Sequence, residues 1–191
     1  MSEIEIKLAA GTDVGLVRKN NEDNFVVNRD LSQSEWIIPQ SSETIPLGKY
    51  GTLLVVADGM GGTNAGEVAS AIAIETVQNA FTPEKLDKIV TFEGEMATEE
   101  AIEEFLTKTI KAADLNIVNA SKEDSSTQGM GTTIVIAWIL NDKAYICWCG
   151  DSRCYVFNGN SGFCRLSKDH SYVQDLSLIH ISEPTRLGMI S

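Results

Sequence analysis

Short apolar runs separated by polar stretches occupy the first third of the chain. They predict strands at 4–9, 24–27 and 53–57, with the polar segment 28–50 as a surface excursion between the last two. The third run stops at Asp58, and Gly59-Met60-Gly61-Gly62 follows it. We therefore expect a buried strand that ends at Asp58 and a sharp turn at Gly59, where the missing side chain leaves the backbone carbonyl open to a ligand.

Helical spacing of apolar residues replaces this pattern in the middle of the chain. One helix is predicted to begin near Asn64, which has capping-box spacing to Glu67, and to end before Pro83. A second helix is predicted after Thr98, a suitable N-cap that is followed by several glutamates. Its apolar stripe comprises Ile102, Leu106, Thr109, Ile110, Ala113, Ile117 and Ala120, and core packing explains such a stripe better than a partner groove. Residues 121–131 are predicted to form a polar loop.

The remaining residues return to strand-like runs. Segments 132–140 and 143–149 flank Asn141-Asp142, a two-residue hairpin signal. Segments 152–157 and 163–166 flank a turn rich in asparagine and glycine. Strands, then two helices, then antiparallel hairpins predict an α+β fold with helices packed on sheets.

Composition narrows the class of protein. A chain of 191 residues with 43% hydrophobic residues fits one domain, and a formal charge of −12 argues against nucleic acid or an anionic membrane as the main partner. No apolar run reaches the roughly 20 residues that span a bilayer, and the acidic first residues do not resemble a signal peptide. The four cysteines, Cys147, Cys149, Cys154 and Cys164, lack zinc-site spacing, so we expect reduced thiols in a cytoplasmic protein.

Acidic residues follow or precede predicted strands at three places. Asp58 ends the strand 53–57, Glu22 and Asp23 precede the strand 24–27, and Asp151 follows the strand 143–149. Each alone could be an ordinary turn, since Asp-Gly pairs and charged turns are common. If the three converge, their repulsion calls for a divalent cation such as Mg²⁺ or Mn²⁺. Arg18 lies nearby in sequence, and its planar fork suits a phosphate group.

Five motifs in order carry a more specific resemblance. They are Arg-Lys-Asn-Asn-Glu-Asp-Asn at 18–24, Val-Ala-Asp-Gly-Met-Gly-Gly at 56–62, Gly-Met-Gly-Thr-Thr at 129–133, Gly-Asp-Ser-Arg at 150–153 and Lys-Asp-His-Ser at 168–171. Together they resemble the PP2C-type (PPM family) metal-dependent protein serine/threonine phosphatases in their bacterial form. The resemblance covers about residues 8 to 176.

The resemblance implies a fold and a set of site residues. The fold is a β-sandwich flanked by helix pairs, incomplete here at the C-terminus, with two Mn²⁺ or Mg²⁺ ions at one end. Asp58 corresponds to the carboxylate that bridges both ions, and Gly59 to the residue whose carbonyl binds one of them. Glu22 and Asp23 match acids of the same cluster. Arg18 matches the arginine that binds the substrate phosphate, and Asp151 matches an acid of a third, weaker metal site. Thr132 and Thr133 are expected to support their strand.

The implied function is hydrolysis of phosphoserine and phosphothreonine in proteins by water activated at two metals, in opposition to a serine/threonine kinase. The protein is expected to be a cytoplasmic monomer active in signalling. An alternative is a catalytically inactive PP2C-like domain that binds phosphoproteins or regulates a partner. A plain metal-buffering module would leave Arg18 and the ordered motifs unexplained.

The chain departs from the family pattern in two places. Met60 stands where many eukaryotic members have a histidine, and a thioether cannot donate a proton; for His170 a structural or surface role is favoured over catalysis. Residues 177–191 look like a translated sequencing adapter, so we expect a partial phosphatase domain at 1–176, a non-native tail at 177–191, and little or no activity from this chain by itself.

Overall fold

A seven-stranded antiparallel sheet forms the centre of the molecule. The computed structural model describes residues 4–37, 43–61, 65–92, 95–96, 98–160, 162–170 and 185–186. The order of the sheet is β13-β10-β9-β5-β2-β3, with β8 paired to β5 as well. Its strands are β2 (Asp23–Asn28), β3 (Trp36–Ile37), β5 (Thr52–Met60), β8 (Gly131–Thr132), β9 (Ile134–Leu140), β10 (Lys143–Cys149) and β13 (Thr185–Arg186).

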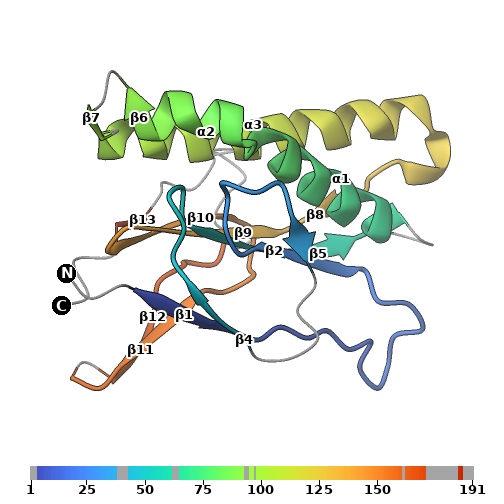
Figure 1. Cartoon of the computed structure of the whole chain (residues 1–191). Coiled ribbons are helices and arrows are strands. Elements are labelled where there is room, and N and C mark those ends of the chain that lie inside the picture. The colour runs from blue at the N-terminus through green and yellow to red at the C-terminus, as the bar shows by residue number, and fades with distance from the viewer. Residues whose placement is uncertain are drawn as a thin grey trace.

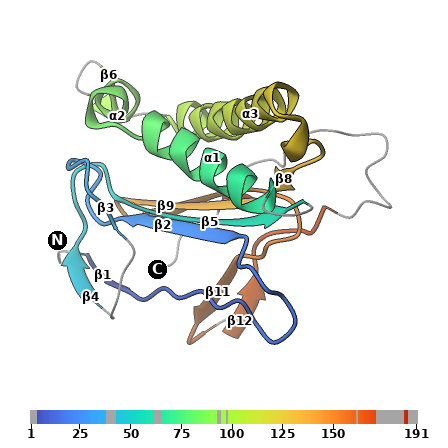
Figure 2. The same ribbon diagram turned by 90° about the vertical axis from the view of Figure 1, so that its right-hand side faces the viewer.

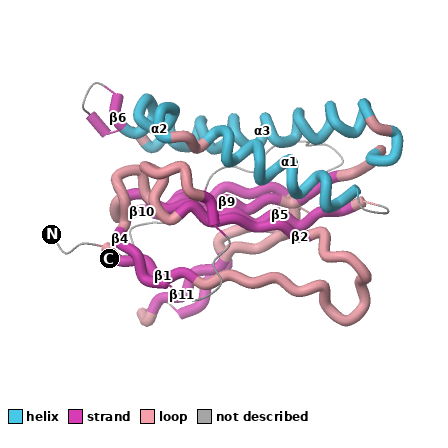
Figure 3. The backbone as a smooth tube through the Cα atoms, turned by 45° about the vertical axis from the view of Figure 1, so that its right-hand side comes forward, coloured by secondary structure: helices cyan, strands magenta, loops and turns pink. Residues whose placement is uncertain are grey.

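The helices cover one face of this sheet and smaller sheets lie on the other side (Figures 1 and 2). The helical layer contains α1 (Ala65–Ala80), α2 (Pro83–Val90), α3 (Glu99–Glu123) and the short 3-10 helix η1 (Ser125–Thr127). The opposite layer contains two strand pairs, β1 (Glu5–Leu8) with β4 (Glu43–Pro46) and β11 (Tyr155–Asn158) with β12 (Gly162–Arg165). A third small pair, β6 (Thr91–Phe92) and β7 (Glu95–Met96), follows α2. The predicted α+β class is confirmed (Figure 3).

The core lies between the helical layer and the central sheet. Trp138 on β9 is fully buried, and Phe81 and Phe105 lie edge-on or tilted against it at 5.2 and 6.0 Å between ring centroids. Its indole N–H donates to the Tyr50 carbonyl at 2.8 Å, so the one polar atom of the ring is satisfied. The predicted stripe of α3 faces this core, because Ile102, Leu106, Thr109, Ile110, Ala113 and Ile117 are all buried. The helical layer and the sheet therefore form one core.

The central strand β5 is longer than the sequence suggested. It continues through Asp58 and Gly59 to Met60, so the predicted strand end at Asp58 and the sharp turn at Gly59 are wrong. Neighbouring strands cause the extension: Asp58 pairs with Asp23 on β2, and Gly59 pairs with Thr132 on β8. Asp58 therefore projects from a paired strand rather than from a loop.

Other local predictions are confirmed in part. Thr98 caps α3 as predicted, accepting a hydrogen bond from the Ala101 N–H. The predicted turn at Asn141-Asp142 joins β9 to β10, and Asn141 has a left-handed φ of 56° there. The segment 28–50 is not only a surface excursion, because β3 and β4 both pair with other strands. The helix α2 after Pro83 was missed, and α3 with η1 occupies part of the predicted loop 121–131. The expected cap Asn64 lies outside the described residues.

Candidate functional site

Two carboxylates meet at one end of the central sheet. Strands β2 and β5 are antiparallel neighbours, and their register places Asp23 opposite Asp58. The two side chains lie close enough for their charges to interact. Partial burial, and after it the charges of Asp23 and Asp151, raise the pKa of Asp58, while Arg18 opposes the shift. Negative charge is thus concentrated at this end of the sheet.

A cleft of about 720 Å³ opens beside this pair. Five of the six residues predicted for the site line it: Arg18, Glu22, Asp58, Gly59 and Asp151. The sixth, Asp23, lies against Asp58 but does not line this cleft. The three acidic segments, separated by more than a hundred residues of chain, therefore converge as the sequence predicted.

Thr133 fixes Asp58 from the adjoining strand. Its side-chain oxygen accepts the Asp58 N–H at 3.1 Å and its own N–H donates to the Asp58 carbonyl at 2.8 Å. The same oxygen lies 2.6 Å from the Ser152 hydroxyl, and Thr132 donates to the Asp58 carbonyl at 2.9 Å. The expectation that these threonines support the strand is confirmed. Through Thr133, the backbone of Asp58 is connected to the turn that carries Asp151.

Glycines allow helix α1 to approach the site closely. A Cβ on Gly59 would lie 2.8 Å from the Glu22 carbonyl oxygen and in still closer contact with the backbone of Gly66. A Cβ on Gly66 would in turn lie 2.8 Å from the carboxyl group of Glu22. The Ser70 hydroxyl, one turn along α1, donates to the Glu22 carbonyl at 2.9 Å. Gly59 is therefore needed for close approach between strand and helix rather than for a turn.

Arg18 lies on an exposed loop between β1 and β2. The loop is closed at its base by the Asn21 amide, which donates to the Thr12 hydroxyl at 2.7 Å. The Asn21 side chain also accepts the Asp23 N–H at 3.1 Å, which connects the loop to the first residue of β2. The Arg18 side chain is exposed and reaches the cleft, so it is available to an anion there.

The oxygen atoms at this end of the sheet suit a hard cation, although the described side chains are not close enough together to coordinate a single ion. Carboxylate and carbonyl oxygens are the ligands preferred by Mg²⁺ and Mn²⁺, and a cation would offset the carboxylate repulsion that adds to the effect of burial on the pKa of Asp58. Across the part of the chain that the structure describes, no three His, Cys, Asp or Glu side chains are close enough together to hold one ion. Asp58, Glu22 and Asp151 line the cleft, and Asp23 lies beside Asp58.

Among the cleft residues that were not predicted as part of the site, three bring side chains of chemical interest. Met60 lines the cleft and is half exposed, and Asp169 and His170 form another part of its wall. His170 is bonded to the turn at Gly150, which agrees with a structural role but places the ring in the cleft rather than on the outer surface. The sequence shows only that an Asp-His pair follows a strand, and its contacts depend on the tertiary fold.

Comparison with known proteins agrees with this geometry. The family model described as Protein phosphatase 2C matches residues 46–183. A serine/threonine phosphatase stp of Listeria monocytogenes is 34% identical over 86% of this chain and 55% of its own length. The chain therefore spans about half of that relative. No described helix is long and apolar enough to cross a membrane.

Solved structures give the same result. The serine/threonine phosphatase Stp1 from Staphylococcus aureus superposes with a TM-score of 0.60 at 27% identity, over 91% of this chain and 56% of that one. The catalytic domain of the serine/threonine protein phosphatase PstP, in complex with two manganese ions, superposes with a TM-score of 0.63 at 25% identity. The match covers 97% of this chain and 72% of that one. The motifs, the fold and the matched profile agree, and the chain belongs to the protein phosphatase 2C family.

Proposed function

We propose that this chain carries the N-terminal part of the active centre of a metal-dependent protein serine/threonine phosphatase. The observation that carries the proposal is the convergence of Arg18 with Asp58 and Asp151 in one cleft, beside the Asp23–Asp58 pair. The substrates are proteins that bear phosphoserine or phosphothreonine, placed there by a serine/threonine kinase. The protein acts as a monomer in the cytoplasm.

The residues divide into metal ligands and a phosphate ligand. Asp58, Asp23, Glu22 and the Gly59 carbonyl would hold two Mn²⁺ or Mg²⁺ ions, and Asp151 would belong to a third, weaker site. When bound, the ions supply an activated water and offset charge on the phosphoryl oxygens. The Arg18 guanidinium donates paired hydrogen bonds to two phosphoryl oxygens, which orients the phosphorus toward the carboxylate cluster. Because the Met60 thioether carries no transferable proton, the departing serine or threonine oxygen takes its proton from solvent or another group.

A catalytically inactive phosphoprotein-binding domain is the second candidate. One observation favours it: within the described residues no three ligating side chains surround a single ion position. Such a domain would bind phosphate through the exposed Arg18 side chain but would not hydrolyse the phosphoester. The two candidates differ in whether bound phosphopeptide is hydrolysed.

Hydrolysis of a phosphothreonine peptide, followed by phosphate release, separates the candidates. The chain spans 55% of the Listeria relative, so the assay compares it with a version extended by the remaining residues of that relative. We expect Mn²⁺-dependent release by the extended version, abolished by EDTA and by Asp58→Asn, and little release by the chain itself. Tight peptide binding without phosphate release by the extended version would establish the second candidate.

A further inference from the structure

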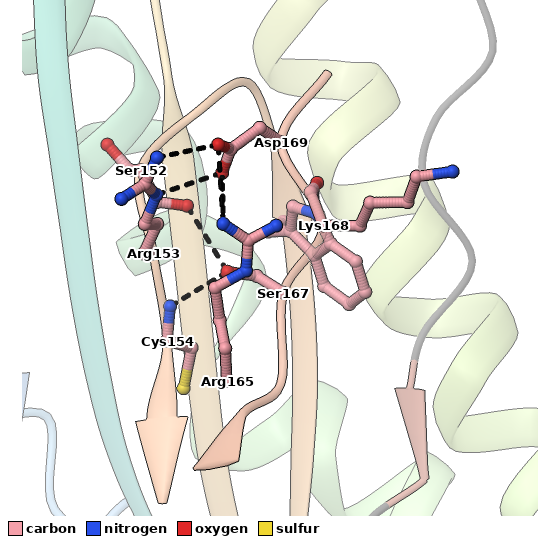
Figure 4. A network of polar contacts seen from close by, with 8 residues as sticks. Ser152, Arg153, Cys154, Arg165, Ser167, Lys168 and Asp169 are labelled. Atoms are coloured by element: carbon pink, nitrogen blue, oxygen red, sulfur yellow. Dashed lines mark hydrogen bonds and ion pairs between the residues drawn. The ribbon is translucent and has the colours of Figure 1, made fainter. Parts of the chain in front are cut away.

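The segment 166–170 runs alongside the turn 150–154 and is bonded to that turn and to the end of β10. The Trp148 indole N–H donates to the Lys168 carbonyl at 2.9 Å, and the Leu166 N–H donates to the Cys154 carbonyl at 2.9 Å. The Ser167 hydroxyl accepts the Cys154 N–H at 2.9 Å. Figure 4 shows the hydrogen bond between Ser167 and Cys154 and the ion pairs of Asp169 with Arg153 and Arg165. The turn that carries Asp151 is therefore held by a second stretch of chain.

His170 and Gly150 are bonded in both directions. The Gly150 N–H donates to His170 Nδ1 at 3.0 Å, and the His170 N–H donates to the Gly150 carbonyl at 3.1 Å. Because Nδ1 accepts, the proton of the neutral ring lies on Nε2. The imidazole lies nearly parallel to the Trp148 ring, at 13° between planes and 6.4 Å between centroids. Both polar backbone groups of Gly150 are thus bound by one residue.

Gly150 needs such a constraint. Its φ of +104° lies in a region that glycine alone visits readily, and a Cβ there would lie 2.8 Å from the Thr133 side chain. A glycine can also adopt other backbone conformations at this position. Each of them would change the direction in which the next residue, Asp151, leaves the turn. Fixing both peptide groups of Gly150 fixes the direction in which Asp151 leaves the turn.

Asp169 holds the far side of the same turn. Its carboxylate accepts two hydrogen bonds from the Arg153 guanidinium, at 3.1 and 2.8 Å, and one from Arg165 at 3.3 Å. The Arg153 hydrogen bond is the main reason that the pKa of Asp169 lies below its usual value. The turn is therefore bound before Asp151 by His170 and after it by Asp169.

We propose that His170 is a positioning residue, which fixes Gly150 so that Asp151 projects into the cleft as a metal ligand. The inference rests on the proposed role of Asp151 as a ligand. In this role His170 acts through the Gly150 peptide groups, to which it is bonded in both directions.

Hydrogen exchange of the Gly150 amide in the metal-free chain is the first test. His170→Ala removes the acceptor and should speed exchange about five- to tenfold, as expected for loss of one hydrogen bond. His170→Asn offers an amide oxygen near the position of Nδ1 and should restore most of the protection. Lys168→Ala is the matched control, since that exposed side chain points away from the network (Figure 4). Unchanged Gly150 exchange in a folded His170→Ala protein would overturn the inference.

Mn²⁺ binding is the second test, read from paramagnetic broadening of the Ser152 amide signal during titration. We expect His170→Ala to need about three- to tenfold more Mn²⁺ for half-maximal broadening, and His170→Asn to match the parent chain. Parent-like binding by His170→Ala, in a series where Asp151→Asn abolishes the broadening, would refute the positioning role. If Asp151→Asn also leaves the broadening intact, the ligand assignment of Asp151 fails, and this inference fails with it, while the Gly150 exchange result stands separately.

Discussion

Gly59→Ala tests how strand β5 is packed against helix α1. The added Cβ would lie 2.5 Å from the carbonyl carbon of Gly66 and 2.8 Å from the Glu22 carbonyl oxygen. Both are backbone atoms, so no side-chain rotation relieves the clash. The backbone of α1 must move by more than about 0.9 Å to reach the 3.4 Å of ordinary contact, because the Gly66 carbonyl oxygen lies closer to the added Cβ than the carbonyl carbon does. That movement also stretches the bond from Ser70 to the Glu22 carbonyl.

Overpacking of this kind costs about 3 kcal/mol, which lowers the melting temperature by roughly 6 to 12 °C in a chain of this size. Gly131→Ala is the matched control, because its Cβ would meet only the flexible Met60 side chain at 3.5 Å. Both substitutions reduce the entropy of the unfolded chain equally, so the control should be neutral or slightly stabilising. Thermal unfolding followed by circular dichroism measures both. Equal melting temperatures for the two variants would show that α1 does not depend on the missing side chain at Gly59.

Three other predictions follow from the site and the core. Asp58→Asn should reduce Mn²⁺-dependent turnover of the extended protein at least about a hundredfold, since it removes charge where two cations are proposed to meet; near-parent turnover would contradict the two-metal assignment. Arg18→Ala should raise KM for a phosphopeptide with a melting temperature within about 2 °C of the parent, and Arg18→Lys should recover only part of the loss, because lysine lacks the bidentate fork. Unfolding of Arg18→Ala with an unchanged KM would make the arginine structural. Burial raises the pKa of the Cys147 thiol to about 12, so iodoacetamide at pH 8 should label exposed Cys164 first and spare Cys147 in the folded chain, as read by mass spectrometry. Because the folded state disfavours the thiolate, stability should fall as pH rises from about 9 toward 12; fast labelling of Cys147 at pH 8 would contradict its burial.

Local signals in the sequence predicted much of the fold. The Thr98 cap, the stripe of α3 and the Asn141-Asp142 turn each depend on neighbouring residues, and each is confirmed. The extension of β5 through Met60 could not be predicted in this way. It depends on pairing with β2 and β8, and β8 lies some seventy residues further along the chain. An acid followed by glycine usually marks a turn, and here tertiary pairing overrides that preference.

The same distinction applies to the site. Arg18, Glu22, Asp58, Gly59 and Asp151 were found because each belongs to a motif, and the fold brings them to one cleft. The contact between His170 and Gly150 was not predicted, because it joins residues 20 positions apart through a backbone geometry that only the folded chain defines. Whether the predicted residues bind metal, and whether 177–191 lies outside the native domain, stay predictions.

The central claim is that the end of the sheet at Asp23 and Asp58 is a divalent metal centre. Anomalous diffraction from crystals of this chain soaked in Mn²⁺ tests it most directly, with Asp58→Asn crystals as the comparison. We predict a manganese peak within coordination distance of the Asp58 carboxylate in the parent crystals and no peak there in the variant. A parent map with no peak at Asp58 under saturating Mn²⁺, or an undiminished peak in Asp58→Asn, would contradict the claim.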